Sequence, residues 1–117
     1  MESVSAFRLA DQSFAPYGED VHRASIAKLI GPDRSTTIGA GLANFDGNPI
    51  SWTVQYDEVS TVIRGEFYLT ANGDRHTLQS GDVIWIPRGT EVQYAGLNAL
   101  VFYALYPVGW EDARHAA

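Results

Sequence analysis

The chain has 117 residues, no cysteine and a formal net charge of −6. This length suits one domain with one hydrophobic core, so we expect a single domain over residues 1–117, with an N-terminal arm over about 1–20 and a short C-terminal tail over about 110–117. The missing cysteine excludes disulfides, thiolate metal sites and a cysteine nucleophile, and the scattered positive charges of Lys28 and seven arginines argue against a nucleic-acid partner.

The N-terminal segment, up to Phe14, has neither the basic start nor the apolar centre of a secretory signal. No window approaches the roughly 18 consecutive apolar residues that a membrane-spanning helix needs. The sequence therefore predicts a cytoplasmic protein without a membrane partner.

Short runs rich in β-branched and aromatic residues recur along the chain between turn signals, a pattern typical of a β-sandwich or barrel. The runs predicted as strands are 21–30, 36–45, 50–56, 59–71, 75–79, 83–86, 91–94 and 99–106. Helix is nearly absent from this reading, and only the tail over 110–117 is a candidate for a helical turn.

Four turn signals separate these runs. The clearest is Asn72-Gly73, because a type I′ hairpin turn needs residues that tolerate positive φ at both central positions. The others lie at 31–33, 46–49 and 96–98, where glycine, proline, asparagine and aspartate gather. We therefore expect a tight hairpin at Asn72 and turns at the other three places.

Two glycine-anchored segments carry a family resemblance. In the first, Glu58 is followed by six residues and then Gly65; in the second, Gly81 is followed by five residues and then Pro87-x-Gly89. This pair resembles the two motifs of the cupin superfamily. The resemblance implies an all-β fold, a single cupin with an RmlC-like jelly-roll antiparallel β-barrel, in which the glycines allow tight strand turns.

Four segments extend the resemblance to a narrower family. The stretches 38–41, 51–58, 81–89 and 102–110 resemble the cupin half of the ethanolamine-utilisation family EutQ, above all in Trp52-Thr-x-x-Tyr56-Asp-Glu58 and in Pro107-x-x-Trp110. EutQ proteins have been linked to acetate kinase activity, which the resemblance makes a candidate here. Small cupins commonly pair, so the resemblance also implies a homodimer.

A typical cupin holds a metal with a His-x-His pair, a glutamate and one further histidine. Projected onto this chain, those positions fall on Trp52, Val54, Glu58 and Val92, so only Glu58 retains a ligating group. Stable transition-metal sites need three or four converging ligands, and no cofactor is therefore predicted. A weak divalent-cation site made of Glu58, tyrosine and water remains an alternative. The histidines of the chain, which match no ligand position, are His22, His76 and His115.

The pocket is instead expected to be aromatic with one acid. Alternation along a strand places Trp52, Val54, Tyr56 and Glu58 on one face, with Val92 and Tyr94 sharing another. Apolar neighbours should raise the pKa of Glu58, which suits a general acid or base, and tyrosine hydroxyls can orient a ligand.

We therefore predict Glu58 and Tyr56 as catalytic residues. The predicted ligand-binding residues are Trp52, Val54, Val92 and Tyr94.

The function favoured by this pocket is the binding, with or without transformation, of a small polar metabolite: a carboxylate, an aldehyde or an acyl compound. Several alternatives stay open. The pocket can bind a ligand without catalysis, or the barrel can be filled and serve as a structural dimer, with Glu58 an inherited and idle acid. Acetate kinase-like activity and a metal-dependent cupin enzyme have less support from the residues.

Overall fold

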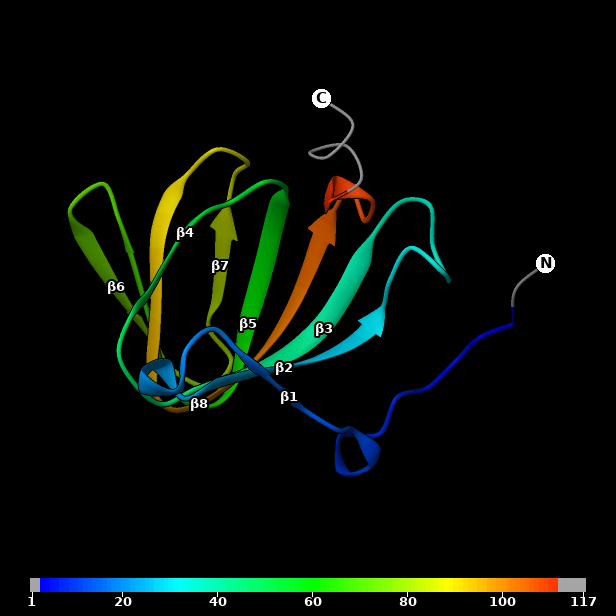
Figure 1. The fold of residues 1–117 in the computed structure, drawn as a ribbon, viewed down its shortest axis with the longest axis horizontal. Coiled ribbons are helices and arrows are strands. Elements are labelled where there is room, and N and C mark those ends of the chain that lie inside the picture. The colour runs from blue at the N-terminus through cyan, green and yellow to red at the C-terminus, as the bar shows by residue number, and fades with distance from the viewer. Residues whose placement is uncertain (1–2, 112–117) are drawn as a thin grey trace.

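The structure is a computed structural model that describes residues 3–111, and it is almost entirely β-sheet (Figure 1). Two short 3-10 helices, η1 (Leu9–Asp11) and η2 (Asp20–His22), flank the first strand. The strands are β1 (Ala15–Tyr17), β2 (Ala24–Ile30), β3 (Gly39–Phe45), β4 (Ile50–Thr53), β5 (Asp57–Ala71), β6 (Asp74–Leu78), β7 (Val83–Ile86) and β8 (Glu91–Tyr106). Within the described residues, no helix has the length and apolar character to cross a membrane.

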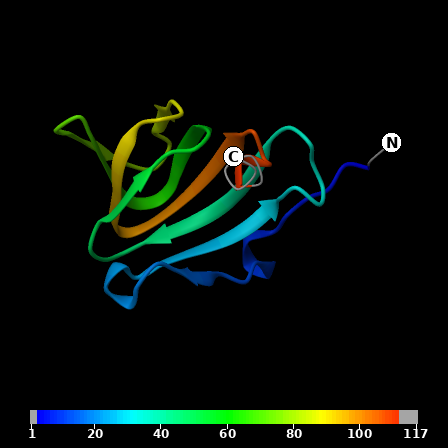
Figure 2. The ribbon, with the colours of Figure 1, turned by 45° about the horizontal axis from the view of Figure 1, so that its top comes forward.

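All eight strands belong to one antiparallel sheet whose order is β1-β2-β3-β8-β5-β6, with β4 paired to β8 and β7 paired to β5. Figure 2 shows β2, β3, β8 and β5 side by side across the curved sheet. The hydrogen-bonded path of the described residues runs from β1 to β6 and does not close on itself. The all-β jelly-roll prediction is confirmed, in the form of a sheet that curls without a closed ladder.

Two long strands give the sheet its curl, because each changes partner along its length. The first part of β5 pairs with β7 and its second part with β6, while β8 follows it throughout. The register between β5 and β8 shifts between Val62 and Glu66, where Gly65 has a φ of 77° opposite Asn98 with a φ of 48°. Such a bulge bends both strands and switches which side chains point inward.

The bulge corrects one turn prediction. The segment 96–98 lies inside β8 and is no connection between strands. Glycine and asparagine tolerate the positive φ of a bulge as readily as that of a turn, so the two structures share one sequence signal. The hairpin turn at Asn72 and Gly73 is confirmed, since their φ angles are 54° and 81°.

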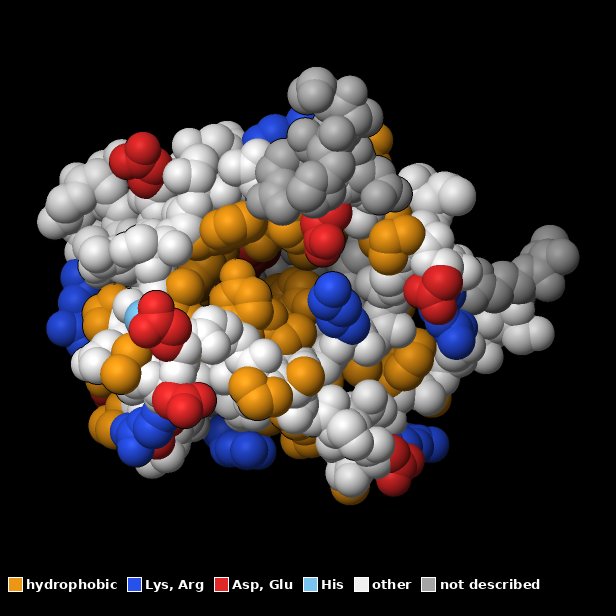
Figure 3. Space-filling model, viewed as in Figure 1, with side chains coloured by type: hydrophobic (Ala, Val, Ile, Leu, Met, Phe, Trp, Pro, Cys, Tyr) orange, Lys and Arg blue, Asp and Glu red, His pale blue; other side chains and the backbone are white. Residues whose placement is uncertain are grey.

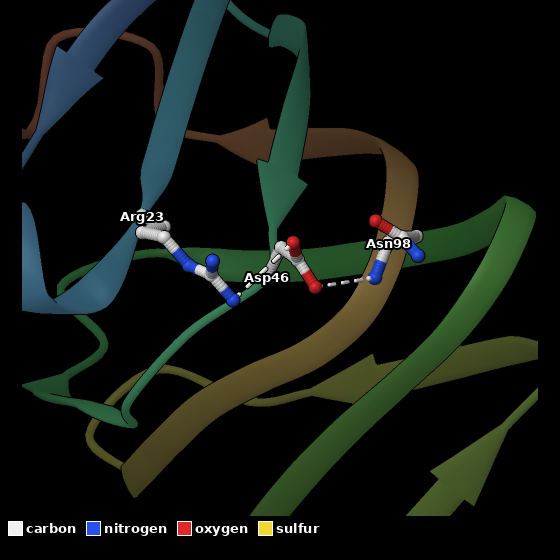
Figure 4. A network of polar contacts seen from close by, with 3 residues as sticks. All are labelled: Arg23, Asp46 and Asn98. Carbon is white, nitrogen blue, oxygen red and sulfur yellow. Dashed lines mark hydrogen bonds and ion pairs between the residues drawn. The ribbon is translucent and has the colours of Figure 1, made fainter.

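Asp46 connects three parts of the sheet around this bulge. Its carboxylate pairs with Arg23 at 3.4 Å, just before β2, and accepts a hydrogen bond from the backbone N–H of Asn98 at 3.0 Å. Figure 4 shows Asp46 between these two residues. The turn that follows β3 is thereby attached both to β2 and to the bend of β8.

Other strand boundaries also differ from the sequence prediction. β1 was not expected, because three residues that include a proline give no periodic signal. The predicted strand 21–30 begins only at Ala24, after η2, the strand 36–45 begins at Gly39, and the strand 50–56 ends at Thr53. The tail over 110–117 lies mostly outside the described residues.

The hydrophobic core has a main cluster between the curled faces, in which the rings of Phe45, Phe67 and Tyr94 stack with centroids 5.4 to 6.1 Å apart. A smaller cluster of Ala27, Leu42 and Leu100 lies apart from it and packs against Phe14 of the N-terminal arm. Several residues of the main cluster, among them Phe45, Phe67 and Tyr94, also border a cavity in the interior.

Candidate functional site

A cavity of about 830 Å³ lies inside the curled sheet. Its walls come from β1, β2, β3, β4, β5 and β8, together with the segment after β4 and the turn after β8. Figure 3 shows a hollow lined by hydrophobic side chains, with acidic and basic side chains near its rim. The pocket is therefore open, and the alternative of a filled barrel is not what the fold shows.

Glu58 is the buried acid of this cavity, with 5% of its surface exposed. The hydroxyl of Ser60 donates a hydrogen bond to Oε2 of Glu58 at 2.6 Å, and that of Tyr94 donates to Oε1 at 3.0 Å. Burial raises the pKa of Glu58 above its ordinary value, and these two hydrogen bonds oppose the rise. The direction of this pKa shift agrees with the sequence expectation.

Tyrosines surround this carboxyl from several elements. Burial and the nearby charge of Glu58 raise the pKa of Tyr17, Tyr56, Tyr94 and Tyr103, that of Tyr103 to about 12. All four hydroxyls are therefore protonated at neutral pH. Those of Tyr17 and Tyr103 make no hydrogen bond within residues 3–111, so they are available to donate to a ligand in the cavity.

Tyr103 lies where it does because its neighbour on β3 is a glycine. Gly41 pairs directly with Tyr103, and a Cβ added there would lie 2.6 Å from Cζ of the tyrosine. The ring therefore rests over the bare backbone of Gly41. The sequence analysis did not identify this role of Gly41 in supporting an aromatic ring.

The predicted site residues divide into two groups. Trp52, Tyr56, Glu58 and Tyr94 all line the cavity. Tyr56 does not bond to Glu58; its hydroxyl accepts a hydrogen bond from Nε1 of Trp52 at 3.3 Å.

Val54 and Val92 do not line the cavity. They belong to the main core cluster and are 0% and 4% exposed. The alternation argument failed for Val54 because the chain leaves the sheet between β4 and β5, so positions 52 to 58 are not one continuous strand.

The sequence analysis also missed Ser60, Tyr17, Tyr103 and Trp110. Ser60 had a usable signal, because it stands two residues after Glu58 on one strand and so shares its face. Tyr17 and Tyr103 reach the cavity only through the pairing of distant strands.

The residues do not fit the metal that this fold commonly holds. The former ligand positions Val54 and Val92 are apolar and enclosed by the core, and both oxygens of Glu58 accept hydrogen bonds from hydroxyls. Among residues 3–111, no three histidine, aspartate or glutamate side chains converge. One carboxyl in an aromatic wall is a poor donor set for a divalent transition metal.

Comparisons with known proteins agree with the fold. The sequence model of the ethanolamine utilisation protein EutQ matches residues 15–112. The acetate kinase EutQ of Escherichia coli (strain K12) is 26% identical over 96 residues, which cover 81% of this chain and 41% of the relative. The chain thus spans about two fifths of that protein's length.

Two solved structures are similar in three dimensions. The putative ethanolamine utilization protein of Salmonella typhimurium LT2 superposes with a TM-score of 0.81 at 22% identity, over 90% of this chain and 87% of that one. The EutQ protein of Clostridium difficile superposes with a TM-score of 0.70 at 28% identity, over 74% of this chain and 70% of that one. A matched family model over most of the strands and a shared jelly roll lead to one conclusion: the chain belongs to the EutQ family of cupins.

Proposed function

We propose that this protein binds a small carbonyl-bearing metabolite, an aldehyde, a carboxylate or an acyl compound, inside the cavity. The observation that carries the proposal is the buried carboxyl of Glu58 in the wall of an open cavity of about 830 Å³. A buried acid in the wall of an open cavity is typical of a ligand-binding site.

The chemistry of the site suits a proton transfer. In its protonated form Glu58 donates to a carbonyl oxygen, and as a carboxylate it accepts a proton from the ligand. The hydroxyls of Tyr17 and Tyr103 supply further donors for an oxygen that gains negative charge. The charge of Glu58 acts on Tyr56, but the hydroxyl of Tyr56 accepts its hydrogen bond from Trp52 in the cavity wall. In this proposal Tyr56 is therefore a positioning residue.

The name of the curated relatives makes acetate kinase activity a second candidate. Phosphoryl transfer depends on cationic groups and magnesium around the phosphates. Among the described residues that line the cavity, the cationic side chain is Lys28, whose Nζ pairs with Glu111 at 3.9 Å. The residues therefore support a carbonyl ligand better than a nucleotide.

A thermal-shift screen of the purified protein tests the proposal, because a ligand that binds the native state raises its apparent stability. The compounds are small aldehydes, carboxylates and acyl esters, with acetyl phosphate and ATP as the second candidate's ligands. The variant is Glu58→Gln, and the matched control is Glu66→Gln on the same strand outside the cavity.

We expect at least one carbonyl compound to stabilise the wild type and the Glu66→Gln protein, and the Glu58→Gln protein to lose that shift. Turnover of the same compound, absent in Glu58→Gln, distinguishes an enzyme from a binding protein. A screen in which no compound shifts the wild type overturns the proposal, and a shift by acetyl phosphate or ATP alone favours the second candidate.

A further inference from the structure

We propose that the ligand of this cavity carries a small cationic head, an alkylated ammonium or similar onium group, held by the aromatic corner that Trp52, Tyr56 and Trp110 form. The inference rests on the proposed function, since it concerns the same cavity. The inference specifies the charge of the ligand, which Glu58 and the tyrosine hydroxyls alone do not determine.

The corner is built from three rings that meet at steep angles. The rings of Tyr56 and Trp110 have centroids 5.1 Å apart and an interplanar angle of 56°, and those of Trp52 and Trp110 are 5.9 Å apart at 71°. The hydrogen bond from Trp52 Nε1 to the hydroxyl of Tyr56 fixes the remaining side. Rings inclined in this way can present several faces to one small group.

The rings come from separate segments that the fold brings together. Trp52 lies on β4, Tyr56 in the connection to β5, and Trp110 in the turn after β8. That turn is attached to the rest of the fold because Val108 is buried and its N–H donates to the carbonyl oxygen of Thr37 at 2.8 Å. The corner is therefore supported by the backbone on each side.

The three corner rings differ in exposure from the stacked rings of the main core cluster. Phe45, Phe67 and Tyr94 are buried and nearly parallel, with interplanar angles of 14° to 30°. Both sets of rings border the cavity, but the three corner rings are only half-buried. The larger exposure of the corner rings leaves more of their surface for a ligand than the buried stack does.

The charges that face the cavity favour a cation. The charged residues of its wall are Glu58, Glu111 and Lys28, and the last two pair with each other at 3.9 Å. Glu58 has only hydroxyl partners, so an ionised Glu58 has no opposite charge beside it. A ligand cation next to Tyr56 would supply that charge and lower the raised pKa of Glu58, so its binding should release a proton.

The sharpest test compares a cation with a neutral molecule of the same shape. Choline and 3,3-dimethyl-1-butanol differ in one atom, nitrogen against carbon, and therefore mainly in charge. Titration calorimetry on the purified full chain gives both dissociation constants. We expect choline to bind at least about tenfold more tightly. In a pH series with buffers of different ionisation enthalpy, choline binding should release protons in the range where Glu58 is partly protonated.

Variants of the corner residues test whether the preference for choline depends on the aromatic ring faces or on side-chain packing in general. Trp52→Leu and Tyr56→Leu should abolish the preference for choline, whereas Tyr56→Phe should retain it because the ring face remains. The matched control is Trp85→Leu, on β7 and 60% exposed outside the cavity, which should bind as the wild type does. Tyr56→Phe also serves as the conservative variant should the leucine variants fold poorly.

Equal or weaker binding of choline than of the neutral isostere overturns the inference, and so does a preference that survives in both leucine variants. If a carbonyl compound from the thermal-shift screen binds while neither probe does, the inference fails and the proposed function stands. If no compound binds at all, both fail together.

Discussion

Glu58 stabilises the fold to a degree that depends on pH, because burial raises the pKa of its carboxyl. The native state then holds a proton that the unfolded chain releases. Its contribution to stability is complete below the unfolded pKa of about 4.5 and is lost as the pH rises through the folded pKa. This change of stability with pH has the opposite sign to that of an acid stabilised by a salt bridge.

We expect Glu58→Gln, which resembles the protonated carboxyl, to gain stability relative to the wild type as the pH rises above about 4.5. The gain should be at most about 1.4 kcal/mol per pH unit. Urea unfolding of both proteins between pH 4.5 and 8 measures it, with Glu66→Gln as the charge-matched control. A difference that stays flat with pH would contradict the raised pKa.

Single residues also show how far the sequence could predict this site. Glu58 was recognisable because its spacing to Gly65 is a motif, and Trp52 and Tyr94 followed from it. Tyr103 was not recognisable, since its place beside Glu58 depends on the insertion of β8 between β3 and β5. Val54 was misplaced because a regular alternation was assumed across a break between β4 and β5.

The pairing of β3 with β8 leads to a prediction at the scale of the element. A Cβ on Gly41 would lie 2.6 Å from Cζ of Tyr103 and 2.8 Å from the carbonyl oxygen of Ala27. We therefore expect Gly41→Ala to cost about 1 to 3 kcal/mol in the free energy of unfolding and to displace the Tyr103 ring. Gly109→Ala is the control, because a Cβ there meets nothing within 4 Å.

Urea unfolding measures the Gly41 effect, and the ultraviolet titration of the tyrosines reports the ring. A Tyr103 hydroxyl pushed toward solvent should titrate below its present pKa of about 12. Equal stability of Gly41→Ala and Gly109→Ala would show that β3 and β8 separate easily at Gly41. That result would contradict the close contact between Gly41 and Tyr103.

The bulge between β5 and β8 gives a second element-scale prediction. Gly65 and Gly73 both have positive φ, 77° and 81°, but a Cβ on Gly65 would lie 2.6 Å from the carbonyl carbon of Asn98, while one on Gly73 meets nothing within 4 Å. Alanine at either site bears the backbone penalty, of about 1 kcal/mol. We expect Gly65→Ala to be less stable than Gly73→Ala by at least a further ~1 kcal/mol.

Urea unfolding also measures the Gly65→Ala and Gly73→Ala variants, and similar losses of stability in the two would contradict a steric role for the bulge.

The bulge also shows what the sequence could not predict at the scale of the element. Residues 59–71 and 99–106 read as ordinary strands, and nothing local to them states that Gly65 and Asn98 must face each other.

At the scale of the whole molecule, the outer face of the sheet carries an apolar patch. Val59 pairs with Trp85 across β5 and β7, and Val83 and Tyr106 lie on the same face. All four are exposed, Trp85 to 60%. The homodimer expected from the family resemblance stays a prediction, and this patch is a surface on which a second copy would bury apolar area.

Sedimentation velocity tests that expectation. The wild type should sediment as a dimer at micromolar concentration, and Trp85→Glu should shift it to the monomer, because a charge at the centre of an apolar interface is costly to bury. Val21→Glu is the control, since Val21 is 56% exposed but lies in η2, away from the patch. A monomeric wild type would remove the basis for the dimer.

The central position of β8 has a consequence for the synthesis of the chain. Its 16 residues provide partners for β3, β4 and β5, yet they follow all other described strands in sequence. A nascent chain can form the β2–β3 and β5–β6 hairpins as it leaves the ribosome, but the inner edges of β3 and β5 stay unpaired until residue 106 emerges. Between the emergence of β5 and that of β8, the nascent protein therefore presents two open strand edges, and we expect ribosome-associated chaperones to bind it in that interval.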